Sequence, residues 1–267
     1  MDETPRSPHD ESGFPGGPGS SEGGGSGPLP PASEPGFLDR VGCLLSSPRR
    51  AFRAPRGLSF WLVPLVLVLV VNVLHGLLLQ DLYNDWFLEF AETNTSFSEE
   101  QRVAMIEAFE AKADDGVTVT TVLQAVAGGI GSLGVAFFLV GLFYMFGVNF
   151  GLAGSARYLD VVGVLALSSM TLVLKEIITI PLKLSQQTLA IYTGPAAFAP
   201  HDGGMLSTVL GFFDVFDLAR LFLITIGLSV VGKITASRAV ILVIAFWILG
   251  CGFKLIWAMS PFAGMTP

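Results

Sequence analysis

The chain has 267 residues, of which 51% are hydrophobic and only 14% are charged, and its mean hydropathy is +0.63. An ordinary soluble domain carries about 25% charged residues, so this composition argues against a soluble protein and favours a membrane protein. The net charge of −7 comes from acidic segments outside the apolar runs, and the lack of a long basic face argues against nucleic acid as a partner. The two cysteines, Cys43 and Cys251, are too far apart in the sequence for a Cys-x-x-Cys metal site.

The first part of the chain divides into two segments of different character. Residues 1–36 are rich in Pro, Gly, Ser and acids and have few apolar residues, which predicts a disordered tail. Residues 37–57 place Phe37, Val41 and Leu44 at helical spacing, which predicts a basic amphipathic segment on the cytoplasmic surface of the bilayer. A compatible alternative is that its arginines act as a topology signal. These arginines are Arg40, Arg49, Arg50, Arg53 and Arg56.

Residues 58–79 form the first long apolar run. They carry no formal charge apart from one that His75 would acquire on protonation. A helix of this length is about 33 Å long, which is enough for a hydrocarbon core of about 30 Å. The run therefore predicts a transmembrane helix, and Pro64 is tolerated because neighbouring helices satisfy the backbone groups that a kink releases.

A hydrophilic stretch at residues 80–116 follows, and we interpret it as an external acidic loop. It holds ten acids and only two bases, Arg102 and Lys112. The pattern Ser98-x-x-Gln101 is a capping box ahead of apolar residues that share one face. It predicts a short amphipathic helix over the outer ends of the membrane spans.

The remaining apolar runs predict four further spans. Residues 116–156 carry no charge, and one helix at about 121–150 is the simplest interpretation, with a hairpin that breaks at Gly128-Gly129 as the alternative. Three more runs lie at about 161–182, 212–231 and 239–259. The predicted fold class is therefore an all-α membrane protein with five transmembrane helices between residues 58 and 259 and a disordered N-terminal tail.

Basic residues predict the orientation in the membrane. With five spans, the arginines before the first span, Arg157, Lys233 and Arg238 all fall on one side, and the acidic loop falls on the other. Cytoplasmic loops are enriched in Lys and Arg. We therefore expect a multi-pass protein of the cell membrane with a cytoplasmic N-terminus and an external C-terminus.

Gly129, Gly131 and Gly134 match the spacing G-x-G-x-x-G of dinucleotide-binding turns. That motif works between a strand and a helix, with an acid about 20 residues further on, whereas these glycines lie inside a membrane run. We therefore predict no dinucleotide and no other cofactor. Small residues in membrane helices permit close helix packing. The predicted packing residues are Ala127, Gly131, Gly134, Gly147 and Gly151.

The sequence lacks H-E-x-x-H, a P-loop and paired Cys and His residues. The three histidines show no metal-ligand spacing. Asp214 and Asp217 lie on one predicted helix with Arg220 three residues further on, which indicates a salt-bridged stripe and not a pair of catalytic aspartates. We predict no enzymatic activity and no metal site.

Ionisable residues inside membrane spans are candidates for function. Six of them are predicted to lie at a similar depth near the outer ends of the last three spans. We expect Lys254 or Lys175 to pair with Asp214 or Asp217, and Arg220 to pair with Glu176. Either the pairs specify the fold, or they line a polar cavity for an ion or a lipid headgroup. The predicted cluster is Lys175, Glu176, Asp214, Asp217, Arg220 and Lys254.

The layout of the chain from Phe37 to Met259 resembles the Yip-domain family of Ypt/Rab-interacting membrane proteins, bacterial branch. Three stretches are similar to the family's opening, its external helix and its last two helices: "SPRRAFRAPRGLSFWLVPLVLVL", "SEEQRVAMIEAFEA" and "FFDVFDLARLFLITIGLSVVGKITASRAVILVIAFWIL". The resemblance implies five spans with the N-terminus in the cytosol. Eukaryotic members bind prenylated Rab GTPases, but their DLYGP-type motif is missing here and "DLYNDW" in the acidic loop is only superficially similar to it, so the resemblance implies the fold alone.

The sequence predicts a non-enzymatic membrane protein that organises membranes or binds partner proteins. The expected partners are the lipid bilayer and either another membrane protein or a second copy of the chain. The alternative is a small transporter or channel subunit that uses the polar cluster.

Overall fold

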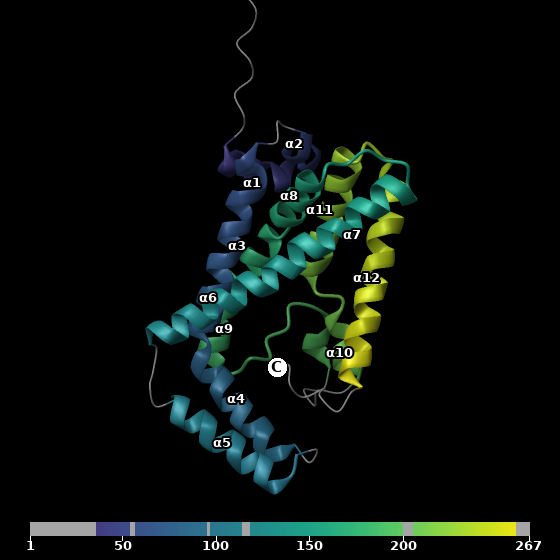
Figure 1. The fold of residues 1–267 in the computed structure, drawn as a ribbon. Coiled ribbons are helices and arrows are strands. Elements are labelled where there is room, and N and C mark those ends of the chain that lie inside the picture. Colours follow the sequence, from purple (N-terminus) through teal and green to yellow (C-terminus); the bar gives the residue numbers. More distant parts are fainter. Residues whose placement is uncertain (1–35, 54–56, 95–96, 114–117, 200–204, 260–267) are drawn as a thin grey trace, which may run out of the picture. The chain divides into compact units, whose positions relative to one another are not determined.

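The computed structural model describes residues 36–53, 57–94, 97–113, 118–199 and 205–259. The predicted tail at residues 1–35 and the predicted surface residue Arg56 lie outside these ranges. The described residues form helices and connecting turns without any strand (Figure 1). The all-α fold class is therefore confirmed.

Among the described residues, four helices are long and apolar enough to cross a membrane, which is compatible with a polytopic membrane protein. They are Leu58–Leu78, Val119–Gly151, Tyr158–Gln186 and Ala236–Ala258. The span predicted at 212–231 corresponds to helix α11, Val215–Val231, which has only 17 residues. The prediction of five spans is therefore not confirmed.

The first span is α3, Leu58–Leu78. Its buried residues Phe60, Pro64 and Val68 recur every four positions and so form one face. This helix packs against α6, Val119–Leu133, and α8, Tyr158–Ser168. Pro64 lies inside the helix without ending it.

The second span is one continuous helix, so the hairpin alternative at Gly128-Gly129 is wrong. It begins at Thr118, whose hydroxyl accepts the Thr121 N–H at 3.2 Å. Two stretches have π-helical hydrogen bonding, and both start at a glycine. In order, the pieces are α6, Val119–Leu133; η1, Gly134–Leu139; α7, Val140–Phe146; and η2, Gly147–Gly151.

Glycines bring this helix close to its neighbours, at positions that differ from the predicted ones. A Cβ atom added at Gly129 would lie 3.0 Å from Leu69 of α3. At Gly141 it would lie 3.1 Å from Val162 of α8. These two glycines therefore allow the second span to lie against the first and third.

Of the five predicted packing residues, only Gly147 makes such a close approach, with a Cβ position 2.6 Å from Leu242. Ala127 and Gly131 are exposed. Gly131, Gly134 and Gly151 have no neighbouring atom within 4 Å of a Cβ position. The prediction is wrong for these residues, because the face that meets a neighbour depends on the rotation of the helix about its own axis, which the spacing of small residues does not determine.

The third span runs from Tyr158 to Gln186 and is longer than the predicted 161–182. It has a short interruption at Ser169, whose hydroxyl donates to the Leu165 carbonyl at 2.8 Å. The interruption separates α8 from α9, Met170–Gln186. All ten residues at 161–170 are buried, so this part of the helix is the centre of the core.

The last two long helices are α11, Val215–Val231, and α12, Ala236–Ala258, which pack against each other. A tight turn joins them, and Lys233 in this turn has a φ of 54°. Two short helices precede α11: η3, Pro195–Phe198, and α10, Met205–Gly211.

Four further described helices lie outside the long apolar ones. Ahead of α3 come α1, Phe37–Ser46, and α2, Pro48–Arg53. The predicted acidic loop is mostly helical and contains α4, Gln80–Thr93, and α5, Glu99–Ala113. The predicted capping box of α5 is present, since the Ser98 N–H donates to Gln101 Oε1 at 3.0 Å and the Gln101 N–H donates to Ser98 Oγ at 3.3 Å. Helix α4 is not predicted from the sequence.

Candidate functional site

Part of the predicted polar cluster comes together between α9 and α11. Lys175 Nζ of α9 lies 3.0 Å from Asp214 Oδ2 and 3.8 Å from Asp217 Oδ2. The predicted pairing of Lys175 with these aspartates is therefore present. The Lys175 side chain is only 24% exposed, so an ion pair at this position is largely withdrawn from solvent.

Asp214 has several further partners. It is the N-cap of α11, and its Oδ1 accepts the N–H of Phe216 at 2.9 Å and that of Asp217 at 3.3 Å. The Thr193 hydroxyl donates to Asp214 Oδ2. One carboxylate therefore connects a helix start, the loop before it and a lysine of the neighbouring helix.

Glu176 pairs with His75 of α3, and the prediction that it pairs with Arg220 is wrong. Its Oε2 lies 2.6 Å from His75 Nδ1, and the Thr179 hydroxyl donates to the same oxygen at 3.4 Å. Successive residues of an α-helix point about 100° apart. Because Lys175 faces α11, its neighbour Glu176 faces a different helix.

His75 extends this pair toward α4. Its Nε2 lies 3.1 Å from the Tyr83 hydroxyl. A neutral His75 with its proton on Nδ1 donates to Glu176 and accepts from Tyr83, whereas a protonated His75 donates to both. Burial, and to a smaller extent the Glu176 charge, raise the pKa of the Tyr83 phenol. The three side chains form a hydrogen-bonded chain across α4, α3 and α9.

Neither His75 nor Tyr83 is among the predicted site residues. The spacing of the histidines along the sequence does not reveal this contact, because the partner of His75 is 101 residues away. A usable signal is nevertheless present, because an ionisable residue within an apolar run is costly unless it has a partner.

Arg220 and Lys254 do not form the predicted ion pairs. Asp217 and Tyr144 lie close enough to Arg220 to interact with it electrostatically, but the buried Arg220 Nε has no hydrogen-bond partner. Lys254 is exposed on α12, and the described part of the chain offers it no ion pair. Of the two lysines predicted as alternative partners of the aspartates, Lys175 and not Lys254 therefore forms the pair.

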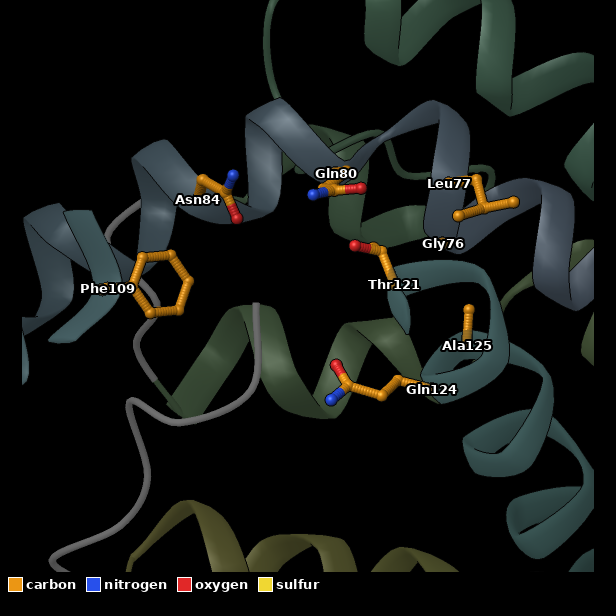
Figure 2. A pocket seen from close by; sticks show the side chains of 8 residues that line it. All are labelled: Gly76, Leu77, Gln80, Asn84, Phe109, Thr121, Gln124 and Ala125. Carbon is orange, nitrogen blue, oxygen red and sulfur yellow. The ribbon is translucent and has the colours of Figure 1, made fainter. Parts of the chain in front are cut away.

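A cavity of about 250 Å³ lies where α3 meets α4. Figure 2 shows Asn84, Thr121 and Gln124 directed toward the same space. Its polar lining is uncharged, and the buried Gln80 Oε1 has no hydrogen-bond partner. Such a lining suits water or a neutral polar group. The lining residues are Gly76, Leu77, Gln80, Asn84, Phe109, Thr121, Gln124 and Ala125.

The predicted surface arginines divide into two kinds. Arg40 is only 3% exposed, donates from Nη1 to the Ala51 carbonyl at 3.2 Å and lies 5.2 Å from the centre of the Phe60 ring. The prediction that Arg40 contacts the membrane surface is therefore wrong, and it joins α1 to α2 and α3. The other described arginines of this group, Arg49, Arg50 and Arg53, are exposed.

Among the described residues, no three His, Cys, Asp or Glu side chains gather closely enough to hold a metal ion. The site consists of hydrogen bonds and ion pairs between side chains of the same chain.

No family model matches the chain, and neither a curated protein nor a solved structure is significantly similar to it.

Proposed function

We propose that the chain is a non-enzymatic integral membrane protein with five spans that organises membranes or binds a partner protein. The observation that carries this proposal is the pair of helices α1 and α2, which are fixed to the apolar helices and present exposed leucines and arginines. The expected partners are the bilayer and either another membrane protein or a second copy of the chain.

The contacts at its two ends support α11 as the fifth span. Its first end lies beside Lys175 of α9. Beyond its other end, Gly232 accepts the N–H of Ser155, which belongs to the turn between the second and third spans, at 3.0 Å. Its 17 residues are about 26 Å long, at the lower limit for a transmembrane helix. Five spans place the two termini on opposite sides of the membrane.

The packing of α1 and α2 supports a surface role. Phe52 is fully buried, and α2 packs against α11. By contrast, Leu38 is 80% exposed and Leu45 is 86% exposed. Exposed leucines on one helix that is followed by a helix with exposed arginines are typical of a segment that inserts its apolar side chains among lipid headgroups.

The polar cluster supports a structural role for most of the ionisable residues. Lys175, Asp214, Glu176 and His75 each have a partner in the protein. Breaking a largely buried pair leaves an uncompensated charge, so these pairs hold three helices in register. This arrangement favours a scaffold over a catalyst.

A reconstitution experiment tests the proposal. The full chain is inserted into vesicles, and vesicle shape and crosslinked species are compared with those of the variant Leu38→Ser/Leu45→Ser. We expect the wild-type chain to change vesicle diameter or to crosslink to itself or a partner, and the variant to do so less. A wild-type chain that does neither, or that catalyses solute flux, contradicts the scaffold proposal.

The second candidate is a small transporter or channel subunit. The chain Tyr83–His75–Glu176 favours it, because linked protonatable groups are the parts of a proton relay. Proton flux into vesicles that His75→Ala abolishes would support this candidate over the scaffold.

We also propose membership of the Yip-domain family on the basis of the resemblance given above. The family layout has five spans and a cytosolic N-terminus, as proposed here. Reporter fusions at both termini test this topology, and a C-terminal reporter in the cytoplasm would contradict it.

A further inference from the structure

We infer that a cavity between α2 and the turn from α11 to α12 binds the phosphate group of an anionic phospholipid. The cavity has a volume of about 370 Å³, within the range of small-molecule sites. Its polar lining residues are Arg49, Arg53, Ser229 and Thr235. The inference rests on the proposed membrane topology.

The two arginines supply the charge. They are four residues apart on α2, so they lie on the same side of the helix. Both are exposed, and neither has an ion pair or hydrogen bond with any described residue. No acidic residue lines the cavity. Guanidinium groups bind phosphate oxygens through two parallel hydrogen bonds, so a phosphate supplies the partner that the protein itself does not.

The start of α12 adds hydrogen-bond donors. Thr235 is its N-cap with an extended backbone, but the Thr235 side chain makes no capping hydrogen bond. The N–H groups of the first turn therefore receive no acceptor from that side chain, and Ala236 of this turn lines the cavity. The positive end of a 23-residue helix favours an anion at this place.

The position of the cavity at the ends of two proposed spans favours a lipid as the source of the phosphate. It lies where α11 ends and α12 begins, and both are spans in the proposed topology. The ends of spans lie at the level of the lipid headgroups. Basic pockets on the cytoplasmic side of membrane helices are the usual sites for anionic headgroups.

The test uses the full chain in a neutral detergent and three probes: dihexanoyl phosphatidylglycerol, dihexanoyl phosphatidylcholine and inorganic phosphate. Binding is measured by titration calorimetry. We expect the wild-type chain to bind phosphatidylglycerol more tightly than the other two probes. Each arginine near a membrane surface is worth about a fivefold change in affinity, so Arg49→Gln/Arg53→Gln is expected to weaken phosphatidylglycerol binding about 30-fold.

Two further variants make the test specific. Arg50→Gln removes an exposed arginine of the same helix that does not line the cavity, so it is expected to change binding less than twofold. Ala236→Trp fills the cavity without changing its charge and is expected to abolish binding. Equal losses in Arg50→Gln and the double variant would overturn the inference. Inorganic phosphate that binds as tightly as phosphatidylglycerol would overturn the assignment to a lipid.

Alkaline extraction of membranes separates this inference from the proposed function. A chain that leaves the membrane at alkaline pH is not integral, and the proposed function then fails. A chain that stays in the membrane, while its double variant still binds phosphatidylglycerol normally, contradicts the inference alone.

Discussion

In the described part of the chain, charged side chains are paired at one end of α11 and unpaired at the other. At its first end, Lys175 and Asp214 neutralise each other within the protein, and the neighbouring Glu176 does the same with His75. At its other end, Arg49 and Arg53 have no anionic partner among the described residues. A paired charge fixes one helix against another, whereas an unpaired charge remains available to a group outside the chain. The difference indicates which end holds the fold and which end meets a ligand.

The largest expected effect comes from breaking the paired end at Asp214. Asp214→Ala removes the N-cap of α11, the bond from Thr193 and the closer partner of Lys175. Loss of one partner of a buried ion pair costs 3–5 kcal/mol, and we expect about 3 kcal/mol here because Asp217 remains within 3.8 Å of Lys175. The measurement is the free energy of unfolding in mild detergent.

Two controls sharpen this result. Asp214→Asn retains a good N-cap and removes only the charge, so it is expected to cost less than the alanine variant. Glu99→Ala breaks the ion pair with Arg102, in which the Glu99 side chain is 81% exposed, and should leave stability unchanged. A loss at Glu99 as large as that at Asp214 would show that the end of α11 has no special role.

The second prediction concerns the other pair at this end. His75→Ala leaves the Glu176 carboxylate without its closest partner. Hydrogen bonds to charged groups are worth about 1.5–3 kcal/mol, so we expect a loss of about 2 kcal/mol in the free energy of unfolding. Unchanged stability in this variant would mean that the His75–Glu176 contact contributes nothing to the fold and would favour its use in proton transfer.

The third prediction is that stability depends on pH through Tyr83, whose pKa in the folded chain is raised above its ordinary value of 10. A raised pKa stabilises the folded state while the phenol is neutral, and this stability is lost as the pH rises above about 10 through the folded pKa. Tyr83→Phe removes the hydrogen bond to His75 and should cost about 1 kcal/mol at neutral pH. The difference in stability between the wild-type chain and Tyr83→Phe should shrink above pH 10, and a difference that stays constant contradicts the assignment.

The smallest effect is expected at the unpaired end. Arg49→Gln/Arg53→Gln breaks no ion pair or hydrogen bond with the described residues, so the free energy of unfolding in neutral detergent should change by less than about 0.5 kcal/mol. A loss comparable to that of Asp214→Ala would mean that these arginines hold the fold, and the contrast between the two ends would disappear.

The positions of the apolar helices were predictable from the sequence because hydropathy is a property of a single segment. The bilayer requires each spanning segment to be long and apolar by itself, and residues 58–78 satisfy this without reference to any neighbour. Helix α4 was not predictable in the same way. Its sequence mixes acids with aromatic residues. The helix is held partly by a tertiary contact, because the Phe87 ring stacks on the Phe109 ring of α5 with the ring centres 4.3 Å apart.

The partners within the polar cluster depend on rotation about the helix axis, which hydropathy does not report. Glu176 lies in the third apolar run, but the helix that it faces depends on how α9 is turned relative to α3 and α11. The glycines of the second span show the same difficulty, since Gly129 and Gly141 meet neighbouring helices whereas Gly131 and Gly134 do not. The hydropathy of a segment does not give this rotation.

The unbroken second helix has a consequence for the choice of membrane. Its 33 residues are about 50 Å long, whereas the hydrocarbon core is about 30 Å thick. Its first half lies against α3 and its last turn against α12, so it crosses obliquely between them (Figure 1). A rod that exceeds the available thickness must tilt or protrude, and a thicker bilayer relieves that mismatch. In the membrane topology proposed above, the packing of this helix against α3 and α12 therefore sets how far it tilts.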